Sequence, residues 1–159
     1  MSPIKSSRLK ARESAQRYSH RRSAAELVRQ RWEKGGLKCE GCGLVVDVIE
    51  CAHLFGRGRT VISEPWASDP TLCAALCCAR SWGDRIGCHE SLDRGLAPNF
   101  AAVLRQTAVV NFATRHDIPP GSWYITAING DPADALRAIE RVLISRRDEG
   151  AERLLGESR

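Results

Sequence analysis

Cys39-Glu-Gly-Cys42, Leu76-Cys77-Cys78 and Cys88-His89 gather five of the seven cysteines of this chain into three short motifs. The first motif is a Cys-x-x-Cys turn with glycine inside and after it, and small residues let the backbone curl so that two sulfurs face one tetrahedral ion. In a reducing compartment, thiols in this arrangement favour metal binding over disulfide formation. The sequence therefore predicts a structural zinc ion around which the middle of the chain folds.

The second pair of zinc ligands is spaced less regularly than the first. Cys88 is one member, and its partner is Cys77 or Cys78. We favour Cys77, because it directly follows Leu76 at the end of an apolar run that predicts a strand. Cys51 and Cys73 lie inside apolar runs, where a small buried thiol is the expected role. The predicted ligands of the structural Zn²⁺ are Cys39, Cys42, Cys77 and Cys88.

Length and composition indicate one compact domain with extensions. The chain has 159 residues, of which 43% are hydrophobic, and this suffices for one core of ordinary size. The N-terminal residues are polar and lack the apolar segment of a secretion signal. No apolar run approaches the ~18 residues that a membrane span needs, and the odd cysteine count argues against a disulfide scaffold. We expect a soluble, cytoplasmic protein that does not enter a membrane.

Positive charge is concentrated at the start of the chain. Residues 1–34 hold ten lysines and arginines against three glutamates, a net charge of +7 in a chain whose total is +5. Residues 1–22 show no apolar period that would bury a face, so we expect a basic arm that is disordered or a fraying helix. Lysine and arginine side chains on phosphates release condensed counterions, which favours a polyanion partner. A solvated tail that aids solubility is the alternative.

Residues 23–97 predict an α+β core. Ser23 to Glu26 has the pattern of a capping box at the start of a helix, and Gly35-Gly36 ends that helix. Residues 44–54 are rich in β-branched side chains and predict a strand, and residues 71–76 predict a second, short one. Residues 89–96 predict a short helix. The core is thus expected to hold two strands and two helices.

Residues 98–159 predict a helical extension packed on this core. Asp131 suits the N-cap and Pro132 the first turn of the clearest helix of the chain, in which apolar residues recur at intervals of three and four. Its apolar stripe can serve the core or a partner, so a homodimer is one possibility. An earlier helix is expected over residues 98–116. Its buried face is predicted to contain Phe100, Val103, Leu104, Val109, Val110 and Phe112.

The histidines suggest chemistry beside the zinc ion. His53 follows an apolar run and precedes a turn rich in glycine and arginine. Its ring is therefore expected to face a cationic, solvent-reachable concavity, where it can accept a proton from water near neutral pH. His89 and Asp93 lie four residues apart on one face of a predicted helix, where a divalent metal can bind between them. A structural role is the alternative for His53, and helix capping or zinc binding for His89.

Residues 39–95 resemble the zinc-bound HNH endonucleases of the ββα-metal class, a type common among bacteriophage and bacterial proteins. The shared pattern is Cys-x-x-Cys, a histidine before an Arg-Gly turn, and then Leu-Cys and Cys-His with an acidic residue four positions further on. This stretch covers about a third of the chain.

Three features differ from the family pattern. One is the segment Ala79 to Gly87 between the last two zinc thiols, which is either a DNA-contacting loop with Arg80, Trp82 and Arg85 or a simple insertion. Ala52 stands where many members have a metal-binding carboxylate or histidine, so Glu50 is the candidate substitute ligand. Thr71 is the candidate for the position of the central asparagine.

The resemblance implies metal-dependent cleavage of DNA, duplex or branched. His53 would be the general base, oriented by Thr71, and would lie opposite a catalytic Mg²⁺ or other divalent ion held by His89 and Asp93. The ion would stabilise the departing 3′ oxygen while water attacks the phosphorus. Arginines that grip phosphate oxygens with forked donors would position the nucleic acid. The candidates are Arg57, Arg59, Arg80 and Arg85.

Two functions of other classes fit the same residues. One is a zinc-stabilised nucleic-acid-binding module that uses the basic arm for affinity and performs no catalysis. The other is a protein-interaction adaptor in which the zinc site only supports the C-terminal helices. Plasmid nicking in the presence of a divalent metal distinguishes the nuclease from both.

Overall fold

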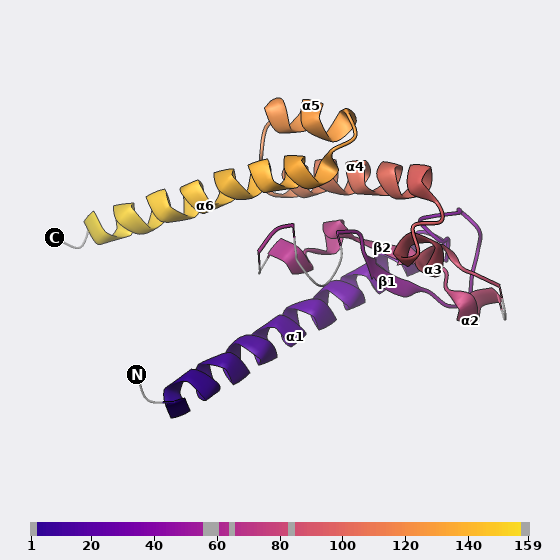
Figure 1. Cartoon of the computed structure of the whole chain (residues 1–159), viewed down its shortest axis with the longest axis horizontal. Coiled ribbons are helices and arrows are strands. Elements are labelled where there is room, and N and C mark those ends of the chain that lie inside the picture. The colour runs from indigo at the N-terminus through magenta and orange to yellow at the C-terminus, as the bar shows by residue number, and fades with distance from the viewer. Residues whose placement is uncertain (1–2, 56–60, 64–65, 83–84, 157–159) are drawn as a thin grey trace.

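The computed structural model describes residues 3–55, 61–63, 66–82 and 85–156. The elements in these ranges are, in chain order, α1 (Pro3–Lys34), β1 (Glu50–His53), the short 3-10 helices η1 (Trp66–Ser68) and η2 (Pro70–Leu72), β2 (Cys73–Leu76), α2 (Ala79–Trp82), α3 (Cys88–Asp93), α4 (Pro98–Arg115), α5 (Ser122–Ile128) and α6 (Pro132–Gly156). The two strands lie between α1 on one side and α4, α5 and α6 on the other (Figure 1). The fold therefore combines helices with one small sheet, as the sequence predicts.

The sheet is an antiparallel pair in which Glu50 lies opposite Leu76 and His53 lies opposite Cys73. Side chains alternate between the two faces of a strand. Ala52 accordingly points into the main core that β1 shares with α4 and α6, whereas Cys73 packs against α1. Glu50 and His53, three positions apart on one strand, consequently project from opposite faces.

The turn that carries the first two cysteines is tied to both β2 and α1 through Glu40. The Glu40 amide donates to the Ala75 carbonyl at 2.9 Å, and the Ala75 amide donates to the Glu40 carboxylate at 2.8 Å. Arg31 of α1 donates to the same carboxylate from two nitrogens, at 2.6 and 2.9 Å. A forked guanidinium–carboxylate pair fixes geometry as well as charge. This contact therefore sets α1 against the turn and the strand.

The C-terminal helices build most of the main core. Phe112 of α4 and Leu136 and Ile139 of α6 are fully buried there. The start of α6 is as predicted, because Asp131 accepts a hydrogen bond from the Asp134 amide at 2.9 Å and Pro132 is the first helical residue. Helix α5 was not predicted, since seven residues are too few for apolar periodicity to show. Among the described residues, none of the helices is both long and apolar enough to traverse a lipid bilayer.

Helix α1 corrects the prediction for the N-terminal segment. The sequence predicts a disordered arm or a fraying helix over residues 1–22 and a helix start at Ser23. Helix α1 runs without a break from Pro3 to Lys34, so the helical alternative holds and the predicted start is wrong. Most residues of this segment are strong helix formers, and a polar helix that extends into solvent needs no buried face. Arg29 also pairs with Glu26 at 3.1 Å and with Glu33 at 2.9 Å. The domain boundary expected after residue 22 thus falls inside a helix.

Two apolar segments are also shorter or less buried than predicted. The strand expected over residues 44–54 is confined to Glu50–His53, because the preceding residues bend through the cysteine turn, in which Lys38 bridges Val45. The second strand spans Cys73–Leu76. Val103 of α4, predicted to be buried, is 61% exposed. It lies nine positions before Phe112, about half a turn out of phase with the buried face.

Replacement of Phe112 by alanine is expected to destabilise the fold by about 3–5 kcal/mol, because the ring is fully buried and its loss leaves a cavity. The matched control is Val103→Ala on the same helix, for which we expect a change within about 0.5 kcal/mol. Urea denaturation followed by circular dichroism measures both free energies of unfolding. Equal losses in the two variants would contradict the buried face assigned to α4.

Candidate functional site

The four predicted zinc ligands come together in space. The Sγ atoms of Cys39, Cys42, Cys77 and Cys88 all lie within 4.8 Å of one another, and those of Cys42 and Cys77 are 4.0 Å apart. Four sulfurs bound to one zinc ion at about 2.3 Å in a tetrahedron are about 3.8 Å apart. The cluster can therefore hold a structural metal ion such as zinc after a small contraction.

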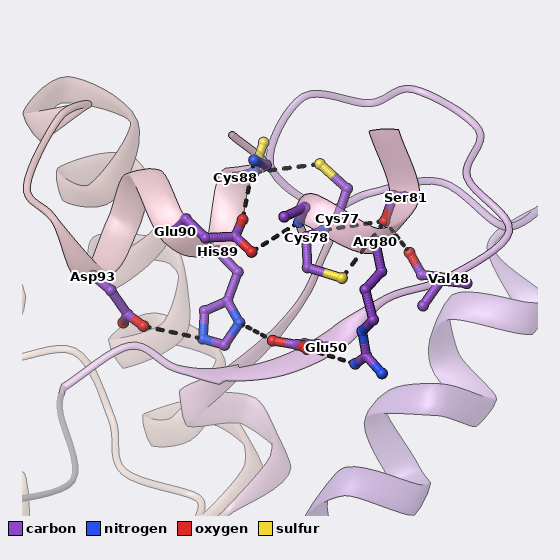
Figure 2. Close-up of polar contacts among 12 residues, drawn as sticks. Val48, Glu50, Cys77, Cys78, Arg80, Ser81, Cys88, His89, Glu90 and Asp93 are labelled. Carbon is purple, nitrogen blue, oxygen red and sulfur yellow. Dashed lines mark hydrogen bonds and ion pairs between the residues drawn. The ribbon is translucent and has the colours of Figure 1, made fainter. Parts of the chain in front are cut away.

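Backbone amides point at this cluster and distinguish the two adjacent cysteines. The Cys77 amide lies 3.3 Å from the Cys39 sulfur, and the Cys88 amide lies 3.4 Å from the Cys77 sulfur. Amide donors of this kind favour a charged thiolate. Cys78 turns away, and its Sγ lies 3.8 Å from the Ser81 hydroxyl (Figure 2). The structure thus brings Cys77, and not Cys78, into the group.

Burial opposes ionisation of two of these thiols, Cys39 and Cys88, in the absence of a metal. It is the main cause that raises the pKa of Cys39, against smaller opposing effects of backbone hydrogen bonds. Burial is also the main cause that raises the pKa of Cys88, followed by the charge of Cys39. A divalent ion binds the thiolate form and displaces the thiol protons. An ion bound by this cluster would therefore displace thiol protons from Cys39 and Cys88.

A glycine lets the last two ligands approach each other. Gly87 precedes α3, and a Cβ atom at this position would lie 2.6 Å from both the Cys77 carbonyl oxygen and the Cys78 Cα atom. Only a residue without a Cβ lets two backbone segments pass this closely. The His89 amide then donates to the Cys77 carbonyl at 3.0 Å. The first turn of α3 is thereby attached to the end of β2, and the residues between them loop out.

His89 connects two carboxylates on the face of the sheet that carries Glu50 (Figure 2). Its Nδ1 atom lies 2.6 Å from Glu50 Oε2, and its Nε2 atom lies 3.6 Å from Asp93 Oδ2. Arg80 pairs with the other oxygen of Glu50 at 2.6 Å. The hydrogen bond with His89 is the main cause that lowers the pKa of Glu50, and Arg80 lowers it further. Glu50 is therefore an anion that can fix the orientation of the His89 ring.

His89 and Asp93 have the spacing of a two-ligand metal site. Two atoms about 2.1 Å from one divalent ion lie about 3–3.6 Å apart when the angle between them is about 90–120°. A histidine that binds metal through one nitrogen commonly donates the other N–H group to a carboxylate, which fixes tautomer and orientation. Glu50 can play that part. The His89 side chain is 11% exposed and that of Asp93 is 69% exposed, so the pair opens to water on the side of Asp93.

His53 does not join this site, which corrects the expected arrangement. The alternation of side chains along β1 directs its ring to the α1 side of the sheet, where Nδ1 lies 3.4 Å from the Cys73 sulfur. Ligand atoms of Cys51, His53 and Cys73 lie within 4.8 Å of one another as a second group. The structure thus groups His53 with Cys51 and Cys73, on the face of β1 opposite to Glu50, and not with His89 and Asp93.

The remaining predicted residues have varied positions. Thr71 donates its hydroxyl proton to Asp69 at 2.6 Å, within the turn that precedes β2. Arg80 is 71% exposed beside Glu50, and Arg85 is exposed at the rim of a cavity of about 290 Å³ that the cysteine cluster also lines. Arg57 and Arg59 lie outside the described residues.

Sequence reasoning missed two features of the site. It considered Glu50 as a direct metal ligand and did not identify it as the partner of His89, because the two residues meet only through tertiary packing. It also treated Cys51 and Cys73 as isolated buried thiols. The signal that could have found the second group was the spacing Cys51-x-His53, since residues two apart on a strand share a face.

Cys77→Ser is expected to lose the cobalt absorption bands of a tetrathiolate site and to lower the unfolding temperature, because metal-binding free energy is also folding free energy. Cys78→Ser is the matched control, one position further along the chain, and should keep both the bands and the stability. Cobalt titration and thermal denaturation measure the two effects. The ligand set is refuted if Cys78→Ser loses the bands and Cys77→Ser keeps them.

Gly87→Ala is expected to destabilise the protein by about 1–3 kcal/mol, because its Cβ would clash with the backbone at Cys77 and Cys78. Gly150→Ala is the control: no atom lies within 4 Å of the added carbon, and alanine favours the helix by about 1 kcal/mol. Chemical denaturation of the zinc-loaded proteins compares them. A neutral Gly87→Ala variant would show that α3 can be displaced from β2 at little cost.

Comparison with known proteins gives no match: no protein-family model, no curated protein and no solved structure is significantly similar to this chain. The function is therefore argued from the geometry and chemistry of the site, since a fold alone does not determine an activity.

Proposed function

We propose that this chain is a metal-dependent endonuclease of the HNH type, which hydrolyses DNA phosphodiester bonds at an ion held by His89 and Asp93. The observation that carries the proposal is the chain of contacts from Glu50 to His89 to Asp93, at 2.6 and 3.6 Å. It presents an oriented imidazole nitrogen and a carboxylate oxygen at a spacing suited to one divalent ion.

The thiol cluster supports this site mechanically. Cys88 and His89 are consecutive residues in the first turn of α3, so an ion that fixes the Cys88 sulfur also fixes the backbone that carries His89. Glu50 of β1 then orients the His89 ring, and Arg80 forms an ion pair with the second carboxylate oxygen of Glu50. Structural zinc and catalytic ion would thus have separate ligands on one short helix.

Among the described residues, His89 and Asp93 are the two ligands proposed for the catalytic ion, and such an open site suits phosphodiester hydrolysis. A divalent ion bound there would polarise a phosphate oxygen, activate water and offset charge on the departing 3′ oxygen. Asp93 is largely exposed, so solvent and a phosphate group can reach this side of the pair. Arg80, also exposed, lies beside Glu50 and can turn its forked donors toward a neighbouring phosphate.

The general-base role of His53 stays a prediction from the resemblance. That family pattern places a metal ligand and the base at consecutive positions, here 52 and 53, and consecutive strand residues face opposite sides. His53 is the last residue of β1. A phosphate bound across the end of the strand can therefore be approached by groups from both faces.

A non-catalytic nucleic-acid-binding module is the second candidate, and one observation favours it. Residues 1–34, with a net charge of +7, include the continuous helix α1, whose N-terminal half extends away from the sheet and the C-terminal helices (Figure 1). A long basic helix can place its charges along a phosphate backbone without reading bases. Binding of this kind requires no ion at His89 and Asp93.

A supercoiled-plasmid nicking assay with Mg²⁺ or Mn²⁺ tests the proposal. His89→Ala and Asp93→Asn are expected to reduce nicking at least about 100-fold, because each removes a ligand of the ion that stabilises the transition state. Asp148→Asn, an equally charge-neutralising change at an exposed helical aspartate, should leave the rate unchanged. His53→Ala should lower the rate about 100-fold or more if its ring removes the proton from water.

Affinity for DNA, measured with the same variants by fluorescence anisotropy, separates the two candidate functions. The nuclease proposal requires that Asp93→Asn binds DNA as the native chain does while it fails to nick. Native protein that binds DNA tightly and nicks with no divalent metal supports the binding module and overturns the proposal.

A further inference from the structure

We propose that Cys51, His53 and Cys73 form a second metal site, which takes a soft or borderline ion such as Zn²⁺ on the face of the sheet that α1 covers. The ligand atoms of all three residues lie within 4.8 Å of one another. His53 Nδ1 and Cys73 Sγ are 3.4 Å apart, close to the separation of two ligands on one ion. The site shares none of the residues at His89, and the only residue it has in common with the nuclease proposal is His53.

The register of the sheet builds this group. Cys51 and His53 are two apart on β1 and so share a face, and Cys73 lies directly opposite His53 on β2. Cys73 packs with residues of α1 on that face. The three ligands thus come from two strands whose pairing is set by the backbone ladder, which holds the donor atoms in place before an ion arrives.

A disulfide bond does not account for the two thiols. Cys51 pairs with Ala75 and Cys73 pairs with His53, so the cysteines are diagonal neighbours in the ladder. Diagonal positions have Cα atoms about 7–8 Å apart, whereas a disulfide needs about 4.4–6.8 Å. None of the seven cysteines forms a disulfide bond in this structure. The diagonal pairing therefore disfavours a disulfide, while the ligand atoms lie within 4.8 Å of one another, a spacing that one ion can bridge.

The donor set selects the kind of ion. Two thiolates and an imidazole favour Zn²⁺ or Cu⁺ over Mg²⁺ and Ca²⁺, which prefer oxygen ligands. With Zn²⁺ the two thiolates balance the charge of the ion, so a neutral unit forms beside the apolar face of α1. Within the part of the chain that the structure describes, the group has three protein ligands. A fourth coordination position is therefore available to water or another ligand.

The surroundings restrict motion of the ligands and leave a route of entry. Cys73 is 2% exposed, and its carbonyl accepts a hydrogen bond from Arg31 of α1 at 2.9 Å. Val28 of α1 is fully buried against the same strand. Cys51 and His53 are half-buried, so an ion can reach them from solvent. Cys73 also lines a cavity of about 460 Å³ together with Arg31.

The second site is distinct from the four-cysteine cluster. Cys73 and Cys77 are four positions apart along an extended segment, about 13 Å at the rise of a strand. The two sites therefore have no ligand in common and cannot share an ion. Coordination through Nδ1 leaves the proton of a neutral His53 ring on Nε2, so the bound ring cannot accept another proton. An occupied site would accordingly withdraw His53 from general-base catalysis, a consequence that rests on the proposed function.

Cadmium NMR of the full-length, cadmium-loaded protein tests the site. We expect two resonances, one from a four-sulfur site and one shifted by the presence of nitrogen. Cys51→Ser and His53→Gln are each expected to remove the second resonance and to keep the first, with the affinity of the second site falling at least about tenfold. Both substituted residues are half-buried, and circular dichroism checks that each variant remains folded.

Cys78→Ser is the matched control, because Cys78 is a buried cysteine outside both groups, and it should keep both resonances. A single resonance from folded native protein overturns the second site. So does a second resonance that persists in both Cys51→Ser and His53→Gln, or a Cys51–Cys73 disulfide found by mass spectrometry in protein purified under reducing conditions. Because the readout is a metal resonance, failure of the nicking assay leaves this result unaffected.

Discussion

The gathering of four thiols at the end of β2 is the constraint on which the rest of the structure depends. It joins three segments that are separate in the chain: the cysteine turn, Cys77 directly after β2, and the first turn of α3. The turn is also bound to β2 through Glu40, whose carboxylate is gripped by Arg31 of α1. A two-stranded sheet is at best marginally stable by itself. Here the thiol cluster, which can hold a metal ion, and the forked ion pair supply the tertiary support that two short strands lack.

The alternation of side chains along β1 explains why the two faces of the sheet can carry different chemistry. Side chains of β1 alternate, so Glu50 reaches His89 on one face and His53 reaches Cys73 on the other. Each face is then covered by a different helix set, α1 on one side and α3 and α4 on the other (Figure 1). A single strand of four residues thereby contributes to two groups of ligands that do not touch.

Motifs with local causes could be predicted from the sequence, and contacts set by register could not. The Cys-x-x-Cys turn and the place of Cys77 at the end of an apolar run were enough to identify the four thiols that meet. The start of α6 followed from Asp131 and Pro132 for the same reason. The partner of His89 depended on how β1 lies against α3, which no local pattern encodes. The full length of α1 could not be predicted from apolar periodicity, because its N-terminal part has no buried face and depends on helix propensity.

Ala52 shows why the ion at His89 and Asp93 would be weakly held and exchangeable. It lies on the same face of β1 as Glu50, but it is fully buried in the main core. A carboxylate at this position would be desolvated without a partner, which costs several kcal/mol. The packing around position 52 therefore disfavours a third protein ligand from this position of β1. Under the proposed function, the ion would then complete its coordination with water and phosphate. A site of this kind gains affinity when the phosphodiester is present, which couples metal binding to substrate binding through the ion itself.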